Sequence, residues 1–92
     1  MGARLKTVSG WQEVRLFDLS RSGAQFVLSR PDKVRDGTLT WLRIDAFGGA
    51  VWQKGDRVGL EFDRVIPLPY LVETRKLAPG IVHEESLGAD SD

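Results

Sequence analysis

Residues 18–23 of this chain read DLSRSG and lie where one strand pattern ends and the next begins. Before them, Val14 and Leu16 alternate with polar neighbours, and after them Ala24 and Phe26 do the same. An alternation of period two is the pattern of a strand with one buried face. Aspartate offers acceptor oxygens, serine a hydroxyl that donates and accepts, and glycine a backbone able to turn sharply beside a ligand. The stretch therefore predicts an ordered junction between two strands.

Short segments with the same alternation recur along the chain, with turn residues between them. They span residues 3–8, 11–17, 24–28, 38–44, 50–53 and 58–62. The tripeptide at 47–49, Phe-Gly-Gly, is expected to be the hairpin connection into the fifth segment. Strands of this kind favour an all-β fold, a small six-stranded antiparallel barrel, because closure removes the exposed edges of so short a sheet.

The pattern changes near the end of the chain, where Leu68 and Leu71 have helical spacing. Prolines in this region are tolerated only in a first helical turn. We expect a short amphipathic helix over residues 69–77, lying against the barrel. Residues 1–80 are thus predicted to form one domain, and residues 81–92 an acidic, disordered tail.

The composition of the 92 residues indicates one soluble, cytoplasmic domain. Thirteen Lys and Arg balance 13 Asp and Glu, so no basic field favours a nucleic-acid polymer or an anionic membrane. Cysteine is absent, which excludes disulfides, thiolate metal sites and cysteine nucleophiles. No apolar run approaches the roughly 20 residues that a membrane-spanning helix needs, and no signal peptide is visible.

The DLSRSG stretch resembles the D/N-x-S-x-x-G motif of the PilZ family, with Asp18, Ser20 and Gly23 at the motif positions. Three further segments resemble, in the family's order, its Gly-led fourth strand, its xVvW strand and its GvrF strand: residues 37–44, 50–52 and 58–62. The resemblance implies a six-stranded antiparallel β-barrel followed by a C-terminal helix, the layout also expected from the strand pattern.

The resemblance also implies a role in bacterial signalling linked to cyclic di-GMP, with the three motif residues as ligand contacts. Ligand-binding members carry an R-x-x-x-R motif ahead of the first strand, but here Arg4 has no arginine four positions away. Either the protein lacks the pair or a preceding segment carries it. An arginine fork binds the Hoogsteen edge of guanine, and removing one buried charge-assisted contact costs about 2–5 kcal/mol. We expect weak or lost binding unless Arg21 or Arg15 substitutes.

A purely structural interpretation of the motif remains open. Asp18 and Ser20 would then satisfy backbone N–H groups of the turn, and Gly23 would adopt a positive φ. On this interpretation the three residues build the junction between the strands and take no part in binding.

The fourth expected strand carries a candidate protein-binding surface. If Thr40, Leu42 and Ile44 face inward, as the family's fourth strand implies, then Leu39 and Trp41 point outward. An outward tryptophan needs a cover, which would be the C-terminal helix, a neighbouring loop or a partner protein. Trp52 matches a core position of the family and is expected to be buried.

No set of residues suggests catalysis or metal binding. Ser20 and Ser22 have no histidine placed as a base, because His83 falls in the expected tail, where it would be solvated. Two functions remain: a cyclic di-GMP receptor, or a ligand-independent adaptor that contacts a protein partner. An OB-like or SH3-like module is less favoured, since neither the charge nor an aromatic-plus-basic strand face suits nucleic acid.

Overall fold

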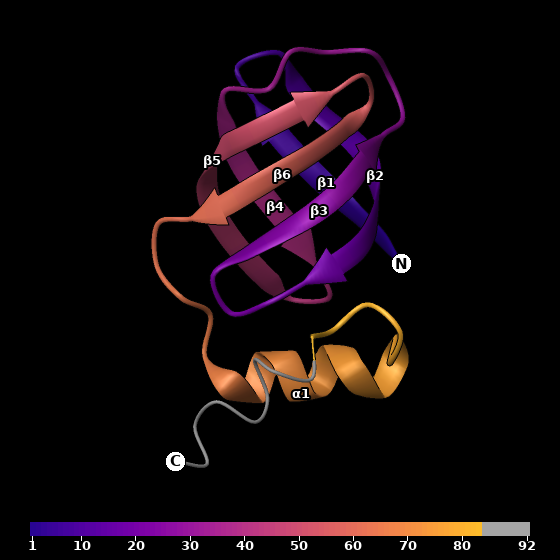
Figure 1. Cartoon of the computed structure of the whole chain (residues 1–92), viewed down its shortest axis with the longest axis vertical. Helices are drawn as coiled ribbons and strands as arrows, with labels where there is room; N and C mark the ends of the chain where they lie inside the picture. Colours follow the sequence, from indigo (N-terminus) through magenta and orange to yellow (C-terminus); the bar gives the residue numbers. More distant parts are fainter. Residues whose placement is uncertain (84–92) are drawn as a thin grey trace.

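The computed structural model describes residues 1–83 and shows a closed barrel of six antiparallel strands followed by one helix (Figure 1). The elements are β1 (Gly2–Thr7), β2 (Gly10–Leu19), β3 (Gly23–Leu28), β4 (Asp36–Trp41), β5 (Ile44–Lys54), β6 (Arg57–Phe62) and α1 (Leu68–Leu77). The mainly-β class, the six-stranded barrel and the short C-terminal helix expected from the sequence are confirmed.

The barrel consists of two three-stranded meanders that close on each other. Strands β1, β2 and β3 pair consecutively, as do β4, β5 and β6, and the pairs β1–β4 and β3–β6 complete the ring. Each strand of the described chain therefore has two neighbours, and the barrel offers no open strand edge to another chain.

The core is filled by the inward residues of all six strands. Leu5, Leu16, Phe26 and Val58 are fully buried at 0% exposure. The period-two alternation expected on both sides of residues 18–23 is confirmed by these positions. Burial of such side chains contributes roughly 1.5–3 kcal/mol each, which is the main stabilising term of so small a barrel.

The β4–β5 hairpin differs from the expectation in its turn. The chain reverses at Leu42 and Arg43, and residues 47–49, expected as the connection, lie inside β5. Gly48 serves close packing instead: a Cβ there would lie 2.1 Å from the Glu61 carbonyl oxygen of β6. The glycine pair was therefore interpreted as a turn, whereas Gly48 is explained by its close packing against the neighbouring strand β6.

The faces of β4 are also exchanged relative to the expectation. Leu39 and Trp41 are buried at 0% and 2% exposure, so the outward partner surface expected at these two residues is wrong. A shift of one residue in the assignment moves every side chain of a strand to the other face. Thr40, expected inside, is half-buried and donates from Oγ1 to Asp45 Oδ1 at 2.7 Å, and Leu42 is exposed.

Helix α1 lies across one end of the barrel and covers Trp41 (Figure 1). The Trp41 indole Nε1 donates to Thr74 Oγ1 at 3.0 Å, and this hydroxyl donates in turn to the Tyr70 carbonyl at 2.8 Å. Leu71 is the apolar anchor of the helix, with 0% exposure. Of the two covers considered for this tryptophan within the chain, the helix is the one observed. No helix within residues 1–83 is long and apolar enough to span a membrane.

Candidate ligand-binding site at the Asp18 turn

Residues 18–23 form a tight turn between β2 and β3 at the barrel end nearest α1 (Figure 1). The Ser20 backbone N–H donates to the Gly23 carbonyl at 2.9 Å, and Ser20 Oγ donates to the same oxygen at 3.3 Å. Ser22 Oγ lies 3.4 Å from Ser20 Oγ. The serine thus satisfies a carbonyl of the turn, where the structural interpretation expected it to accept from an N–H group.

Gly23 is required for a reason other than the expected one. Its φ is not positive; the glycines with positive φ in the described chain are Gly10 and Gly55. A Cβ at position 23 would lie 2.5 Å from the Leu60 carbonyl oxygen, closer than real Cβ contacts. The close approach of β6 therefore excludes a side chain at this position.

Asp18 is engaged by a residue from the end of the described chain. A bulge between Leu16 and Asp18 shifts the register of β2, and the carboxylate Oδ1 contacts His83 Nε2. The backbone fixes this partner: His83 N–H donates to the Leu19 carbonyl at 3.0 Å, and the Leu19 N–H donates to the Ile81 carbonyl at 2.8 Å. The contact is an ion pair when the imidazole is protonated and a hydrogen bond when it is neutral.

This engagement revises the expectation for the start of the tail. Val82 is buried and forms a parallel bridge with Leu19, so residues 81–83 are held against β2. His83 was expected to be fully solvated, and its side chain is 49% exposed while it contacts Asp18. The disorder expected for the rest of the tail concerns residues that lie outside the described part of the chain.

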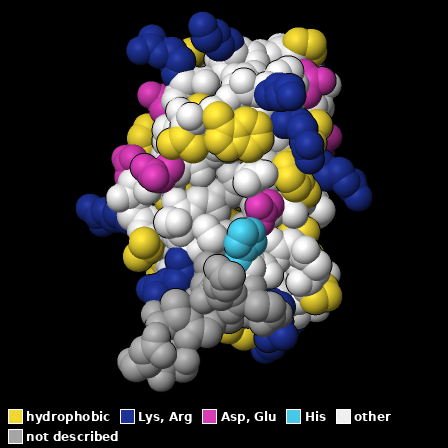
Figure 2. All heavy atoms as spheres, in the orientation of Figure 1, with side chains coloured by type: hydrophobic (Ala, Val, Ile, Leu, Met, Phe, Trp, Pro, Cys, Tyr) yellow, Lys and Arg dark blue, Asp and Glu magenta, His cyan; other side chains and the backbone are white. Residues whose placement is uncertain are grey.

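A hollow of about 210 Å³ opens beside the turn, over β3 and β6. Its floor is Gly59, against which the Trp52 indole lies so closely that a Cβ at position 59 would be 2.1 Å from Nε1. Asp18, Glu61 and His83 supply its charged or titratable groups. Figure 2 shows the histidine beside a carboxylate on this face.

Trp52 was expected in the core and is instead 40% exposed. A bulge between Ala50 and Trp52 shifts the register of β5, so the alternation read from the sequence does not continue through this position. Trp52 therefore forms an aromatic wall of the hollow, although the sequence analysis had placed this residue in the barrel interior.

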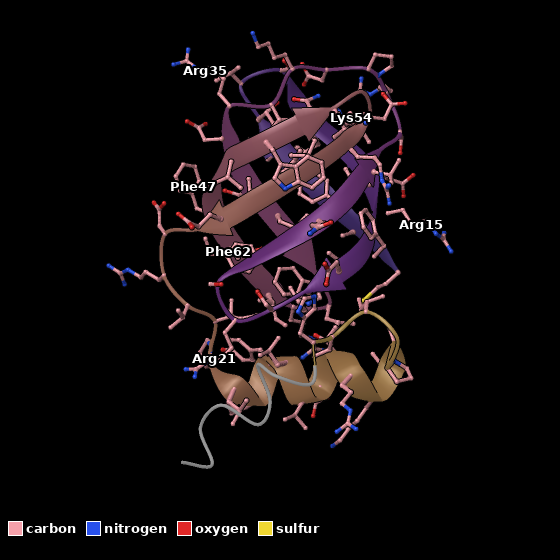
Figure 3. All side chains as sticks on the ribbon, viewed as in Figure 1. Arg15, Arg21, Arg35, Phe47, Lys54 and Phe62 are labelled. Atoms are coloured by element: carbon pink, nitrogen blue, oxygen red, sulfur yellow. The ribbon has the colours of Figure 1, made fainter. Side chains whose placement is uncertain are left out.

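The two arginines proposed as substitutes do not line the hollow. Arg15 is exposed on β2 and points away from the barrel, whereas the Arg21 side chain lies beside the connection from β6 to α1 (Figure 3). The Arg21 carbonyl accepts from the Ile66 N–H at 2.9 Å, which ties the turn to that connection. Asp18, Ser20 and Gly23 are thus brought together at the hollow, without a Lys or Arg among the described residues of its lining.

Three residues of the hollow carried no signal in the sequence: Trp52, Glu61 and His83. Trp52 lies there because of the bulge in β5, and His83 because a distant segment docks on β2, whereas Glu61 is an outward residue of β6 between the buried Leu60 and Phe62. Within residues 1–83 no group of three or more His, Asp or Glu is placed to hold a metal ion.

Comparison of the chain with protein-family models, with curated proteins and with solved structures finds no match.

Proposed function

We propose that the chain is a non-enzymatic, PilZ-like signalling domain of the bacterial cytoplasm that acts as an adaptor. It works by contacting a protein partner and binds cyclic di-GMP only weakly. The DLSRSG stretch at a strand junction of a six-stranded barrel with a C-terminal helix supports the family assignment. The cation-poor lining of the hollow supports the adaptor role.

The weak binding follows from the charge of the hollow. Cyclic di-GMP carries two negatively charged phosphate groups, and the hollow presents the carboxylates of Asp18 and Glu61. Like charges brought together at an interface cost several kcal/mol. A guanine that sought Asp18 would also have to displace His83 from it. Both effects lower the affinity for the dinucleotide.

The test is a calorimetric titration of the full chain with cyclic di-GMP, with cyclic di-AMP as the control for general phosphate binding. We expect no saturation below about a millimolar, which corresponds to a binding free energy weaker than about −4 kcal/mol. Micromolar binding of the guanine compound alone would overturn the adaptor proposal and establish a receptor. Arg15→Ala and Arg21→Ala would then test whether either arginine contacts the ligand from outside the hollow.

A receptor is the second candidate, and one observation favours it. The exposed Trp52 lines the same hollow as Asp18 and Ser20, and aromatic rings stack on nucleobases. Stacking would have to outweigh the unfavourable charge of the hollow, and the same titration measures that balance.

A further inference from the structure

A second concave region lies between the β4–β5 hairpin and α1, and it shares no lining residue with the hollow beside the Asp18 turn. Two adjoining hollows of about 430 and 590 Å³ share Ile44 and Tyr70. We call the two together the hairpin–helix groove. Its exposed apolar residues are Leu42, Phe47, Val65, Tyr70 and Leu77.

The hairpin–helix groove gathers much of the exposed apolar surface of the described chain. Half of the large hydrophobic residues exposed in residues 1–83 line it, and Leu77 reaches 65% exposure. Phe47 points away from the barrel on the outer side of β5 (Figure 3). Exposed apolar surface gathered in one place, rather than scattered, is typical of an interaction site.

Leu42 gives an independent reason to assign a role to this groove. Its φ is +53°, a conformation that glycine or asparagine adopts at lower cost. Among residues 1–83, Leu42 is the one residue other than glycine with a positive φ. Leu42 remains 44% exposed, so burial of its side chain in its own barrel offsets little of the free energy that this backbone conformation costs. A strained leucine kept at the rim of an apolar groove indicates a contact outside the barrel.

The charges around the groove point to the kind of partner. Arg43 and Arg64 line it together with Asp45, Asp63 and Glu73. A rim of mixed sign gives no advantage to a strongly acidic or basic partner, and it supplies both members of the opposite-charge pairs that a self-complementary two-fold interface needs. The net charge of the chain is zero, so two copies approach without long-range repulsion.

We propose that two copies of this chain associate through the hairpin–helix groove as a two-fold symmetric dimer, with Leu42 of each copy seated in the groove of the other. The contact is made by side chains, because the closed barrel of residues 1–83 has no open strand edge for pairing. This dimer goes beyond the adaptor function, which does not depend on it.

Sedimentation of the full chain from micromolar to millimolar concentration tests the proposal. We expect a reversible monomer–dimer equilibrium. Leu42→Asn should raise the dimer dissociation constant at least tenfold, because asparagine tolerates the turn conformation but removes the apolar side chain. Leu77→Ser, on the α1 wall, should weaken the dimer in the same direction. The matched control is Val8→Asn, an exposed apolar residue outside the groove, which should leave the equilibrium unchanged.

A melting curve at a concentration where the chain is monomeric separates lost association from misfolding. Leu42→Asn should melt no lower than the parent chain, because it relieves strain in the monomer. A chain that stays monomeric to about a millimolar would overturn the proposal. Equal dissociation constants for Leu42→Asn and Val8→Asn would overturn it as well. Neither result touches the cyclic di-GMP titration, so the failure of the dimer and that of the adaptor function are distinguishable.

Discussion

The Asp18 turn and the hairpin–helix groove both border hollows of the surface. They differ in whether their side chains have contacts within the chain. At the turn, the Ser20 hydroxyl and the Asp18 carboxylate have partners within the chain. At the groove, Leu42 and Leu77 stay exposed, and one of them has a strained backbone. The sequence of the first region resembles the D/N-x-S-x-x-G motif, and the second region has no stretch of this pattern. The comparison teaches that a stretch resembling a motif and a patch of exposed apolar surface need not coincide, and the dimer contact proposed above lies at the exposed apolar surface.

Truncating two tryptophans, one buried under α1 and the other at the hollow beside the turn, should give the largest effects. Trp41→Ala should lower the free energy of unfolding by about 3–5 kcal/mol, because it opens a cavity and removes the hydrogen bond to α1. Trp52→Ala, at the hollow, should cost less than half as much, because that indole is 40% exposed. Urea unfolding measures both values. Equal losses would contradict the assignment of one ring to the core and the other to the hollow.

Gly23→Ala tests whether the motif glycine is structural. The added Cβ meets the Leu60 carbonyl of β6, and we expect a loss of about 1–3 kcal/mol in the absence of any ligand. Gly2→Ala is the control, because nothing lies within 4 Å of a Cβ there. If Gly23→Ala left the stability unchanged, the packing explanation would be wrong, and a role of this glycine in ligand contact would be favoured.

The contact between Asp18 and His83 is expected to contribute less to stability than the close packing at Gly23, since both side chains are partly exposed. Asp18→Ala and His83→Ala should each lower stability by at most about 1 kcal/mol, and the double variant by about as much as the larger single change. Chemical unfolding of the four chains completes the cycle. If His83→Ala made cyclic di-GMP binding measurable by calorimetry, the turn would be a receptor site that the histidine closes.

The smallest effect is a gain. Leu42→Asn should raise the free energy of unfolding of the monomer by up to about 1 kcal/mol, the strain released when leucine leaves a positive-φ position. Chemical unfolding at low protein concentration measures it. A clear loss would show that the leucine stabilises its own barrel, and the contrast between the two regions would then disappear.

Most of the fold could be predicted from the chain, because its evidence lies in local alternation. Residues such as Leu16, Phe26 and Val58 follow period two, and the turn dipeptides separate them into six strands. The expected helix over residues 69–77 differs from α1 by one residue at its start. Local patterns of this kind are enough to predict an antiparallel barrel.

The failures arose where tertiary packing overrides local preference. Leu42 and Arg43 form the β4–β5 turn without turn-favouring residues, while Gly48 satisfies a packing constraint from β6. Trp52 follows a bulge, which interrupts the alternation. His83 reaches Asp18 only because residues 81–83 pair with Leu19, and no spacing along the chain predicts that. The candidate site was therefore predicted in its turn residues and missed in its aromatic wall and its histidine.

The way the ring closes bears on how the chain folds. Within each meander the strands that pair are consecutive, but the β1–β4 and β3–β6 seams join strands from different meanders. Each seam brings together strands that are far apart in the sequence, which costs loop-closure entropy before the contacts form. Contacts of high sequence separation therefore slow folding. We expect the meanders to form early and the two seams to close in a later, rate-limiting step, on the millisecond-to-second scale of β-barrels.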